Sequence, residues 1–341
     1  MALEGIDHRH LRGDLLKRVS RSFYLSMRFL PAAMREPVSL GYLLARASDT
    51  LADTAQVPVA VRVRCLEQFR DSVPETRPEF TDFYAEVMRD FAPRQSHDGE
   101  RELLQRLPDL FAWLMRSSPK NRGALIAVLE EITQGQSWDL ARFGETDRNG
   151  MLSCCENAEE LETYAYRVAG SVGEFWTRVG FANLGLRFAE EEHSESLVAA
   201  GIAMGKGLQL VNILRDLSED LGNGRCYLPR SELKAAGWSS EGSPDPEVLL
   251  RVSRAWMNRC RNWLGQGWDY ATRLKGRRVR FATVLPLILA EGTLLRMEEA
   301  GASALERKVK ISRAEVRRAM AEAIRFSLFK SAQPKPSEGT V

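Results

Sequence analysis

The sequence predicts an all-α fold with one large helical domain over residues 1–330 and a disordered tail at 331–341. Apolar residues recur mostly every three to four positions, which is the period of an amphipathic helix. The runs of alternating Val, Ile and Thr that would mark β-strands are missing. Hydrophobic residues make up 44% of the chain, enough for a large core, and no repeat or linker divides it.

Proline and glycine divide the helical pattern into elements. Pro31 interrupts an N-terminal helix, and Pro58 and Pro119 are each placed to begin one. The turn at 222–224 ends the most apolar helix, and the polar tail SAQPKPSEGTV is typical of disorder. Helices are expected at about 10–19, 36–54, 58–72, 81–91, 99–116, 119–143, 158–184, 194–221, 246–273, 279–299 and 312–329.

Charge and cysteine content exclude several classes of function. Lys and Arg number 48 against 46 Asp and Glu, so no overall field points to a nucleic-acid partner. Five cysteines without a CxxC pair indicate reduced thiols, with no zinc site or disulfide framework. The N-terminus lacks the apolar region of a signal peptide, and the longest apolar run, 281–290, is too short for a transmembrane segment. We expect a cytoplasmic protein, at most attached to a membrane surface.

Two segments far apart in the sequence carry oxygen-bearing side chains at a spacing of four. Asn212, Asp216 and Asp220 share one helix face, and Asp49 and Asp53 repeat this spacing in RASDTLAD. Either group alone could be solvated surface, because the spacing also arises by chance. On apolar helices, however, carboxylates need partners. Mg²⁺ prefers oxygen ligands, so the two groups together predict a magnesium site that would suit a diphosphate.

Arginines accompany both acidic segments, at Arg21, Arg46, Arg215 and Arg225. A guanidinium fork suits phosphate oxygens, although any one of these could instead be a surface residue or a structural partner of an acid. The basic run RLKGRRVR at 273–280 is interpreted as a solvated loop rather than as a membrane or phosphate patch.

The helix expected at 158–184 combines small and aromatic residues. The small residues at 169–173 cost helix propensity and predict the close approach of another backbone or of a ligand. Aromatic faces can stabilise a cation and a phenol can move a proton, although aromatic residues at this spacing are most often core. All four histidines lie outside the apolar segments, which argues against histidine-based catalysis. The aromatic residues are Tyr164, Tyr166, Phe175 and Trp176.

These segments, in this order, resemble the squalene/phytoene synthase family of head-to-head prenyltransferases over roughly residues 15–300. Within the family, DTLAD, YRVAGSVGEFW and GRCYLP look most like bacterial squalene synthases. The matching motifs are SRSF at 20–23, RxxD at 46–49 leading into DTLAD, YxxxVAGxVG at 164–173, LQxxNIxRDxxED at 208–220 and GRCYLP at 224–229.

The resemblance implies the isoprenoid-synthase helical fold, with both aspartate motifs facing a central cavity. It implies that two molecules of farnesyl diphosphate condense to presqualene diphosphate, and that NADPH then delivers a hydride to give squalene. Tyr164 is expected to be catalytic in the first half-reaction, together with the motif aspartates. Mg²⁺ is implied at Asp49, Asp53, Asn212, Asp216 and Asp220; diphosphate contacts at Ser20, Arg21, Arg46, Arg215 and Arg225; and the cavity wall at Phe23, Tyr42, Val168, Ala169 and Gln209.

Two positions depart from the family pattern. Ala52 stands where the first motif commonly has an acid, which leaves the metal site one carboxylate weaker. Leu287 stands where eukaryotic squalene synthases have a glutamine, so no second-half site is assigned there. The C-terminal membrane anchor of those enzymes is not expected, in keeping with a bacterial soluble form.

The identity of the product stays open from the sequence. Phytoene and dehydrosqualene synthases omit the hydride step, and in hydroxysqualene synthase water captures the cation. An all-α cavity needs no dinucleotide fingerprint, so the lack of one does not bear on NADPH. From another class, a catalytically idle helical assembly partner would have lost its metal and arginine positions, and only Ala52 departs here.

Overall fold

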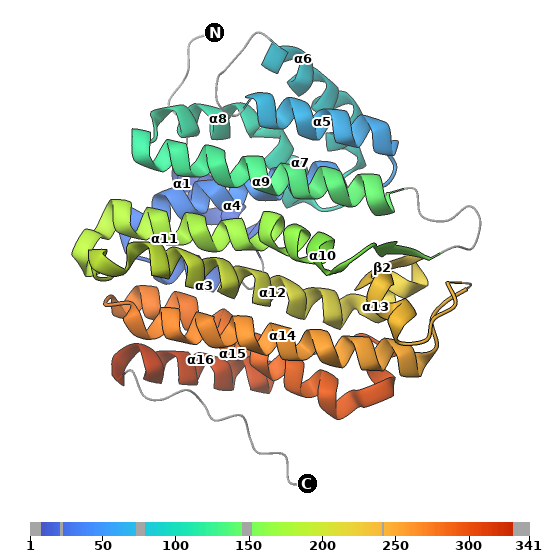
Figure 1. The fold of residues 1–341 in the computed structure, drawn as a ribbon. Helices are drawn as coiled ribbons and strands as arrows, with labels where there is room; N and C mark the ends of the chain where they lie inside the picture. Colours follow the sequence, from blue (N-terminus) through green and yellow to red (C-terminus); the bar gives the residue numbers. More distant parts are fainter. Residues whose placement is uncertain (1–7, 21–22, 73–78, 145–151, 241, 330–341) are drawn as a thin grey trace.

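The structure, a computed structural model, describes residues 8–20, 23–72, 79–144, 152–240 and 242–329. Nearly all of these residues are helical, which confirms the predicted all-α class (Figure 1). The expected tail at 331–341 and Arg21 lie outside the described residues, and the division into one domain at 1–330 stays a prediction.

The observed helices follow the expected ones closely, with η denoting 3-10 or π turns. Up to residue 143 they are α1 (His8–His10), η1 (Leu11–Leu15), α2 (Leu16–Ser20), α3 (Phe23–Phe29), α4 (Ala32–Asp53), α5 (Val59–Ser72), α6 (Glu79–Glu86), η2 (Val87–Phe91), η3 (Ala92–Arg94), α7 (Asp98–Gln105), α8 (Leu107–Arg116) and α9 (Pro119–Phe143).

The second half contains the remaining helices and two short strands. They are β1 (Ser153–Cys155), α10 (Ala158–Ala165), η4 (Tyr166–Gly170), α11 (Ser171–Leu184), η5 (Gly185–Arg187), η6 (Glu191–His193), α12 (Ser194–Gly222), β2 (Arg225–Pro229), α13 (Arg230–Ala235), α14 (Pro246–Arg273), α15 (Arg277–Ala300), η7 (Gly301–Leu305) and α16 (Arg313–Phe329).

The long helices lie in stacked layers, and α12 runs through the middle of the stack (Figure 1). It packs against α11 on one side and against α14 and α15 on the other, while α4 and α9 pack on α11. One apolar core joins these layers from Leu11 to Phe326. Because α12 is covered on several sides, it is apolar around most of its circumference rather than along one stripe.

This central position also explains why α12 resembles a membrane span. Among the described residues, the segment Glu191–Gly222 alone is long and apolar enough to cross a membrane by length and composition. However, 61% of its most apolar window is buried inside the protein, which is typical of a core helix.

Glycines let α12 and α11 approach each other closely. A Cβ atom on Gly173 would lie 1.9 Å from the carbonyl oxygen of Gly201, and one on Gly205 would lie 2.1 Å from that of Ala169. No side chain fits at either position. The close approach predicted from the small residues at 169–173 is therefore confirmed, and the approaching group is the backbone of α12.

The parallel pair β1 and β2 is the one sheet among the described residues, and the sequence analysis did not predict it. Cys154 pairs with Cys226 in its register. The strands are three and five residues long, too short to show a period of two. All five cysteines are buried and free, in agreement with the prediction of reduced thiols.

The interpretation of the basic run at 273–280 as a solvated loop is wrong. Arg273 ends α14, and Arg277 already belongs to α15, so only residues 274–276 connect two helices. Arg280 is buried, and its guanidinium donates hydrogen bonds to the carbonyl oxygens of Leu274, Lys275 and Ser327. The run thus fixes the turn to the end of α16.

Candidate active site

Helices α4 and α12 carry the two acidic motifs, and Asp49, Asp216 and Asp220 each form an ion pair with a basic side chain. Arg46 binds Asp49 within α4, and its other nitrogen binds Glu100 of α7. On α12, Arg215 forms two 2.8 Å hydrogen bonds with Asp216. All of these carboxylates except Glu100 were already predicted as site residues from the sequence.

Two further cations hold the end of α12. Arg225, just beyond the glycine turn, lies 3.0 Å from Asp220. Lys308, in the segment before α16, lies 2.9 Å from Asp216 and 3.1 Å from Glu219. Lys308 was not predicted from the sequence, because it lies in a segment beyond the last family motif.

Burial makes several of these carboxylates hold their protons unusually tightly. Burial and the neighbouring Asp53 raise the pKa of Asp49 to about 7, against the opposing effect of Arg46. Burial also raises the pKa of Asp53, and it raises that of Asp220 to about 6 in spite of Arg225. The pKa of Asp216 is lowered, because hydrogen bonds from its basic partners outweigh its burial. At three of the four aspartates, burial thus outweighs the neighbouring cations.

A polar cavity of about 630 Å³ opens beside the first acidic motif. Asp49 and Asp53 come from α4, and the opposite side is formed by α9, by Tyr164 and by the stretch following α12. Ala52 lies in this wall, and its carbonyl oxygen accepts a 2.7 Å hydrogen bond from Arg62. The polar lining is completed by Gln136, Asp139, Asn223, Arg225 and Tyr227.

A second cavity of about 480 Å³ is lined mainly by apolar and aromatic side chains from α3, α4, α9, α11, α12 and α15. It shares Asp49, Gln136 and Tyr164 with the polar cavity, so the two meet at these residues. Five residues implied for a cavity wall line it, namely Phe23, Tyr42, Val168, Ala169 and Gln209, and so do Arg46 and Asn212. The ring of Phe23 stacks on that of Tyr42 at 6.1 Å.

Several residues that line these cavities have a polar side-chain atom that is buried without a hydrogen-bond partner in the described structure. They include the Nε atoms of Arg46, Arg62 and Arg225 and the Oε1 atom of Gln136. A buried donor left unpaired costs about 1–3 kcal/mol, and more when it is charged. Arg62 and Arg225 line the polar cavity and Arg46 lines the apolar one, so a multiply charged anion bound where the cavities meet would have guanidinium groups around it.

Tyr164 stands where the cavities join, inside a cluster of aromatic rings. Its ring stacks on Tyr227 at 5.2 Å and lies 5.2 Å from the ring of Trp138. Tyr227 donates a 2.5 Å hydrogen bond to Asp139, which is also within hydrogen-bonding reach of Tyr164. Burial and the nearby carboxylate of Asp139 raise the pKa of Tyr164 well above its usual value, so the phenol stays protonated.

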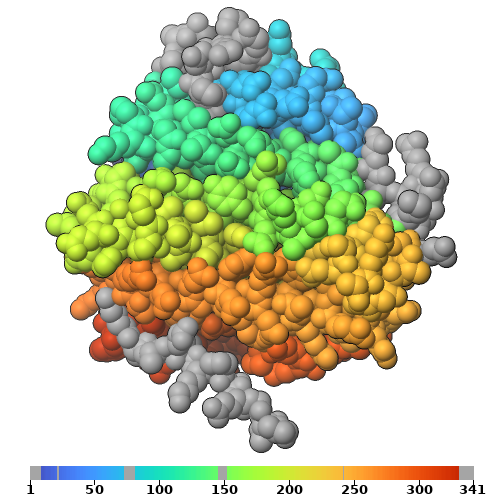
Figure 2. All heavy atoms as spheres, viewed as in Figure 1, coloured from blue at the N-terminus to red at the C-terminus, as the bar shows by residue number. Residues whose placement is uncertain are grey.

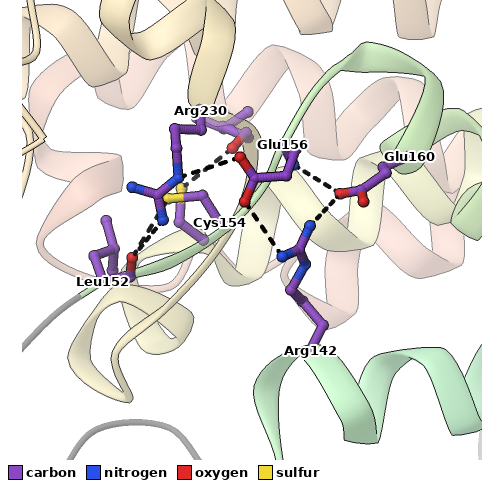
Figure 3. A network of polar contacts seen from close by, with 8 residues as sticks. Arg142, Leu152, Cys154, Glu156, Glu160 and Arg230 are labelled. Carbon is purple, nitrogen blue, oxygen red and sulfur yellow. Dashed lines mark hydrogen bonds and ion pairs between the residues drawn. The ribbon is translucent and has the colours of Figure 1, made fainter.

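An ionic network on the outer side of α9 fixes this cluster in place (Figure 3). Arg142 bridges Glu156 and Glu160, at 3.3 Å and 2.6 Å. Arg230, which follows β2, donates a 3.2 Å hydrogen bond to the carbonyl oxygen of Leu152 before β1. The network joins α9 and α10, which carry Asp139 and Tyr164, to the start of α13, directly after the strand β2 that carries Tyr227.

Some residues implied for the site line neither cavity. Ser20 is buried and donates its hydroxyl to the carbonyl oxygen of Leu16, while Arg215, Asp216 and Asp220 lie beside the cavities in their ion pairs. Arg21 is outside the described residues. In the described ranges, no three His, Cys, Asp or Glu side chains gather into a ready-made metal centre. The metal and diphosphate roles therefore stay predictions.

The main functional candidates that sequence reasoning missed are Asp139, Gln136 and Tyr227. Tyr227 belongs to GRCYLP and was available as a motif residue. Asp139 and Gln136 lie on α9 outside the motifs, with no spacing that relates them to another acid. Their role depends on the packing of α9 against α4 and η4, which only the tertiary structure shows.

The sequence pattern of the squalene/phytoene synthase family matches residues 16–315. A bifunctional lycopene cyclase/phytoene synthase of Pyrenophora tritici-repentis is 30% identical over 251 residues, covering 73% of this chain and 38% of that protein. The squalene synthase of Saccharomyces cerevisiae is 29% identical over 221 residues, covering 65% of this chain and 44% of that protein. This chain thus matches less than half of the length of either curated relative.

Solved structures show the same fold. The structure of TcSQS with the ligand E5700 superposes with a TM-score of 0.72 at 20% identity, over 98% of this chain and 94% of that chain. At this identity the likeness establishes the isoprenoid-synthase helical fold and does not establish the reaction.

Proposed function

Because this chain belongs to the squalene/phytoene synthase family, we propose that it is a squalene synthase that condenses two molecules of farnesyl diphosphate head to head. The first half-reaction would join the two prenyl chains as presqualene diphosphate, with loss of one diphosphate and one proton. In the second, the remaining diphosphate would leave and a hydride from NADPH would give squalene.

One observation carries this proposal. A polar cavity of about 630 Å³ meets an apolar cavity of about 480 Å³ at Asp49, Gln136 and Tyr164. A prenyl diphosphate has the same division, with a charged head and a hydrocarbon chain. A substrate bound across this junction would place its reacting C1 atom beside Tyr164.

The arginines are suited to hold the departing diphosphate. Arg46 lines the apolar cavity and Arg225 lines the polar one, and the Nε atom of each is buried and unpaired in the described structure. Fixed donors directed at developing negative charge stabilise a transition state without reorganisation. Gln136 offers a further polar group at the same place.

The acidic motifs fit a divalent cation. Burial raises the pKa values of Asp49, Asp53 and Asp220, and the nearby arginines offset it only in part. We propose Asp49, Asp53, Asn212, Asp216 and Asp220 as the groups that hold Mg²⁺. The bound ion would supply charge neutralisation for a leaving diphosphate.

Tyr164 is proposed to handle the proton of the first half-reaction. Its protonated phenol lies beside the junction, and Asp139 and Tyr227 are placed to orient it. The phenol can donate a hydrogen bond to a diphosphate oxygen, or relay a proton towards Asp139. Asp139 acts through Tyr164 and Tyr227 and is therefore a positioning residue.

The apolar cavity would protect the cation left when diphosphate departs. Its wall includes the rings of Phe175 and Trp176, and aromatic faces stabilise positive charge. An apolar wall also limits the capture of the cation by water, which would give a hydroxylated product.

The relatives do not distinguish squalene from phytoene as the product, because they include both squalene and phytoene synthases. The experiment is a product analysis of the purified chain with farnesyl or geranylgeranyl diphosphate, Mg²⁺, and either NADPH or none. Squalene formed only with NADPH, with presqualene diphosphate accumulating without it, supports the proposal. Turnover of geranylgeranyl diphosphate alone would make the chain a phytoene synthase, and a dehydrogenated or hydroxylated C30 product would assign it to a neighbouring reaction.

A further inference from the structure

Four of the eight exposed large apolar side chains in the described structure gather at one end of the molecule. Phe29 ends α3, Leu186 lies in η5, and Leu328 and Phe329 end α16. The end of α11 with η5, the turn between α14 and α15, and the end of α16 lie together on the left in Figure 1. Figure 2 shows this end from the same side. The side chains and their exposed fractions are Phe29 (43%), Leu186 (58%), Leu328 (43%) and Phe329 (74%).

Contacts join the end of α3, the segment after η5 and the end of α16 to the start of α15 and the turn before it. The ring of Phe29 lies 4.7 Å from that of Phe281, and Arg278 donates a 2.7 Å hydrogen bond to the Phe29 carbonyl oxygen. Arg280 binds the carbonyl oxygen of Ser327, next to Leu328. The amide of Lys275 donates a 2.8 Å hydrogen bond to Phe188, two residues after Leu186. We call these four side chains and the cations around them the end surface.

The end surface is basic. Six exposed cations lie on the same segments as the apolar side chains, and among these six only Lys275 has an acidic partner in the described structure, Glu190. Arg28 and Arg278 lie close enough to Arg35 to help lower its pKa, after the larger effect of burial. The six cations are Arg28, Arg187, Lys275, Arg277, Arg278 and Arg325.

The apolar cavity lies directly behind this surface. Met27 of α3 and Ala282 and Pro286 of α15 line it, so these helices present one side to the cavity and another to the end surface. On α12, the residues that line the cavity extend from Asn212, near the acidic motifs, to Gly201. At 1.5 Å per residue, Gly201 lies about 16 Å nearer to the end surface than Asn212 does. Its apolar end therefore points towards the exposed apolar side chains.

We propose that the end surface docks on an anionic lipid bilayer. Aromatic and aliphatic side chains ringed by Lys and Arg are suited to the boundary between lipid headgroups and acyl chains. The reason for such docking rests on the proposed function, because prenyl chains and a C30 hydrocarbon dissolve in a bilayer and not in water. The docking itself does not require turnover.

Two other occupants fit less well. The segment 331–341, SAQPKPSEGTV, contains no aromatic residue and one large aliphatic residue, so its composition does not suit an apolar surface. In a symmetric dimer through this surface, the cations of one copy would face those of the other, and like charges in contact oppose association.

The test is flotation of the full chain with vesicles of phosphatidylcholine alone or mixed with phosphatidylglycerol. We expect binding to the anionic vesicles that weakens as salt is raised, since screening shortens the reach of surface charge. The double variant R277E/F329S should bind at least tenfold more weakly. The matched control L295S/R318E changes the same kinds of residue on α15 and α16, about 27 Å and 16 Å along these helices from the first pair.

The outcomes separate the possibilities. No binding of the unmodified chain, equal binding to both vesicle types, or equal losses in R277E/F329S and the control would each overturn the proposal. A dimer in light scattering that R277E/F329S dissociates, without vesicle binding, would assign the surface to a second copy. If R277E/F329S does not fold, as judged by circular dichroism, R187E/R277E takes its place. A chain that binds vesicles but makes no squalene would contradict the proposed function and leave the docking surface intact.

Discussion

The phenol of Tyr227 donates a 2.5 Å hydrogen bond to the carboxylate of Asp139, a residue 88 positions earlier in the chain. The bond joins α9 to β2 below the ring of Tyr164. Replacing Asp139 by Asn keeps the shape but removes the charge that both phenols share. We expect D139N to lower kcat about tenfold or more, with little change in KM, because the variant loses orientation of a group acting in the transition state.

Steady-state kinetics with farnesyl diphosphate checks this expectation, and D269N, a change at an exposed position of α14, is the control. A rise in KM at unchanged kcat would place Asp139 in ground-state binding instead of in the positioning of Tyr164.

Tyr164→Phe should abolish the first half-reaction and keep substrate binding. The variant retains the aromatic ring, and so its stacking on Tyr227, but loses the phenol that would move the proton. We expect at least a hundredfold slower formation of presqualene diphosphate in single-turnover experiments, within the range for general acid–base groups. Unchanged single-turnover rates would remove Tyr164 from the chemistry.

Arg225→Gln should weaken binding of a prenyl diphosphate. Arg225 lines the polar cavity, and a hydrogen bond to a charged group contributes about 1.5–3 kcal/mol. This corresponds to about a tenfold to hundredfold higher Kd for farnesyl thiodiphosphate, an unreactive analogue, in calorimetry. Arg225→Lys should recover part of the loss through its charge, and R254Q, at an exposed position, should have no effect. Equal affinity of R225Q and the unmodified chain would contradict the assignment.

Gly205→Ala should destabilise the protein. The added Cβ would lie 2.1 Å from the carbonyl oxygen of Ala169, so α12 and η4 would have to move apart. We expect the free energy of unfolding to fall by about 2 kcal/mol or more in denaturant titrations. The matched control is Gly265→Ala, where no atom lies within 4 Å and the change should stabilise α14 by about 0.5–1 kcal/mol. A neutral G205A would mean that the helices are not in contact there.

The raised pKa of Asp49 predicts a dependence of stability on pH in the presence of a chelator. Below its ordinary value of 3.8, the carboxyl is protonated in both the folded and the unfolded chain. From there to about 7, the folded state keeps its proton and the unfolded state loses it, so stability falls as pH rises and then levels off. Asp49→Asn should reduce this fall in thermal unfolding, whereas D269N should not. An identical pH profile for D49N would contradict the shift.

The helices could be predicted well from the sequence, because the residues that begin and end a helix act locally. Pro119 stands at the first position of α9, and the helix expected at 246–273 has these bounds in the structure. The carboxylates of α4 and α12 were also found, because a spacing of four on an apolar helix can be seen without coordinates. The small residues at 169–173 correctly predicted a close backbone approach.

What the sequence did not show depends on contacts between distant segments. Lys308 binds Asp216 from a segment 92 residues further on, and Asp139 meets Tyr227 across 88. The basic run at 273–280 was interpreted as a loop, because its many charged residues obscure the helical apolar pattern. In the structure, Val279 and Phe281 are buried on the apolar face of α15. Ser20 was selected by its motif, yet its hydroxyl turns back to its own helix in the structure.

The central claim is that the polar cavity holds a diphosphate while its prenyl chain fills the apolar cavity. A crystal structure of the protein with farnesyl thiodiphosphate and Mg²⁺ tests this most directly. We predict diphosphate oxygens within hydrogen-bonding distance of Arg46 and Arg225, metal density between Asp49 and Asp220, and the chain running past Tyr164 towards Gly201. A diphosphate bound elsewhere, or a prenyl chain lying outside the apolar cavity, would contradict it.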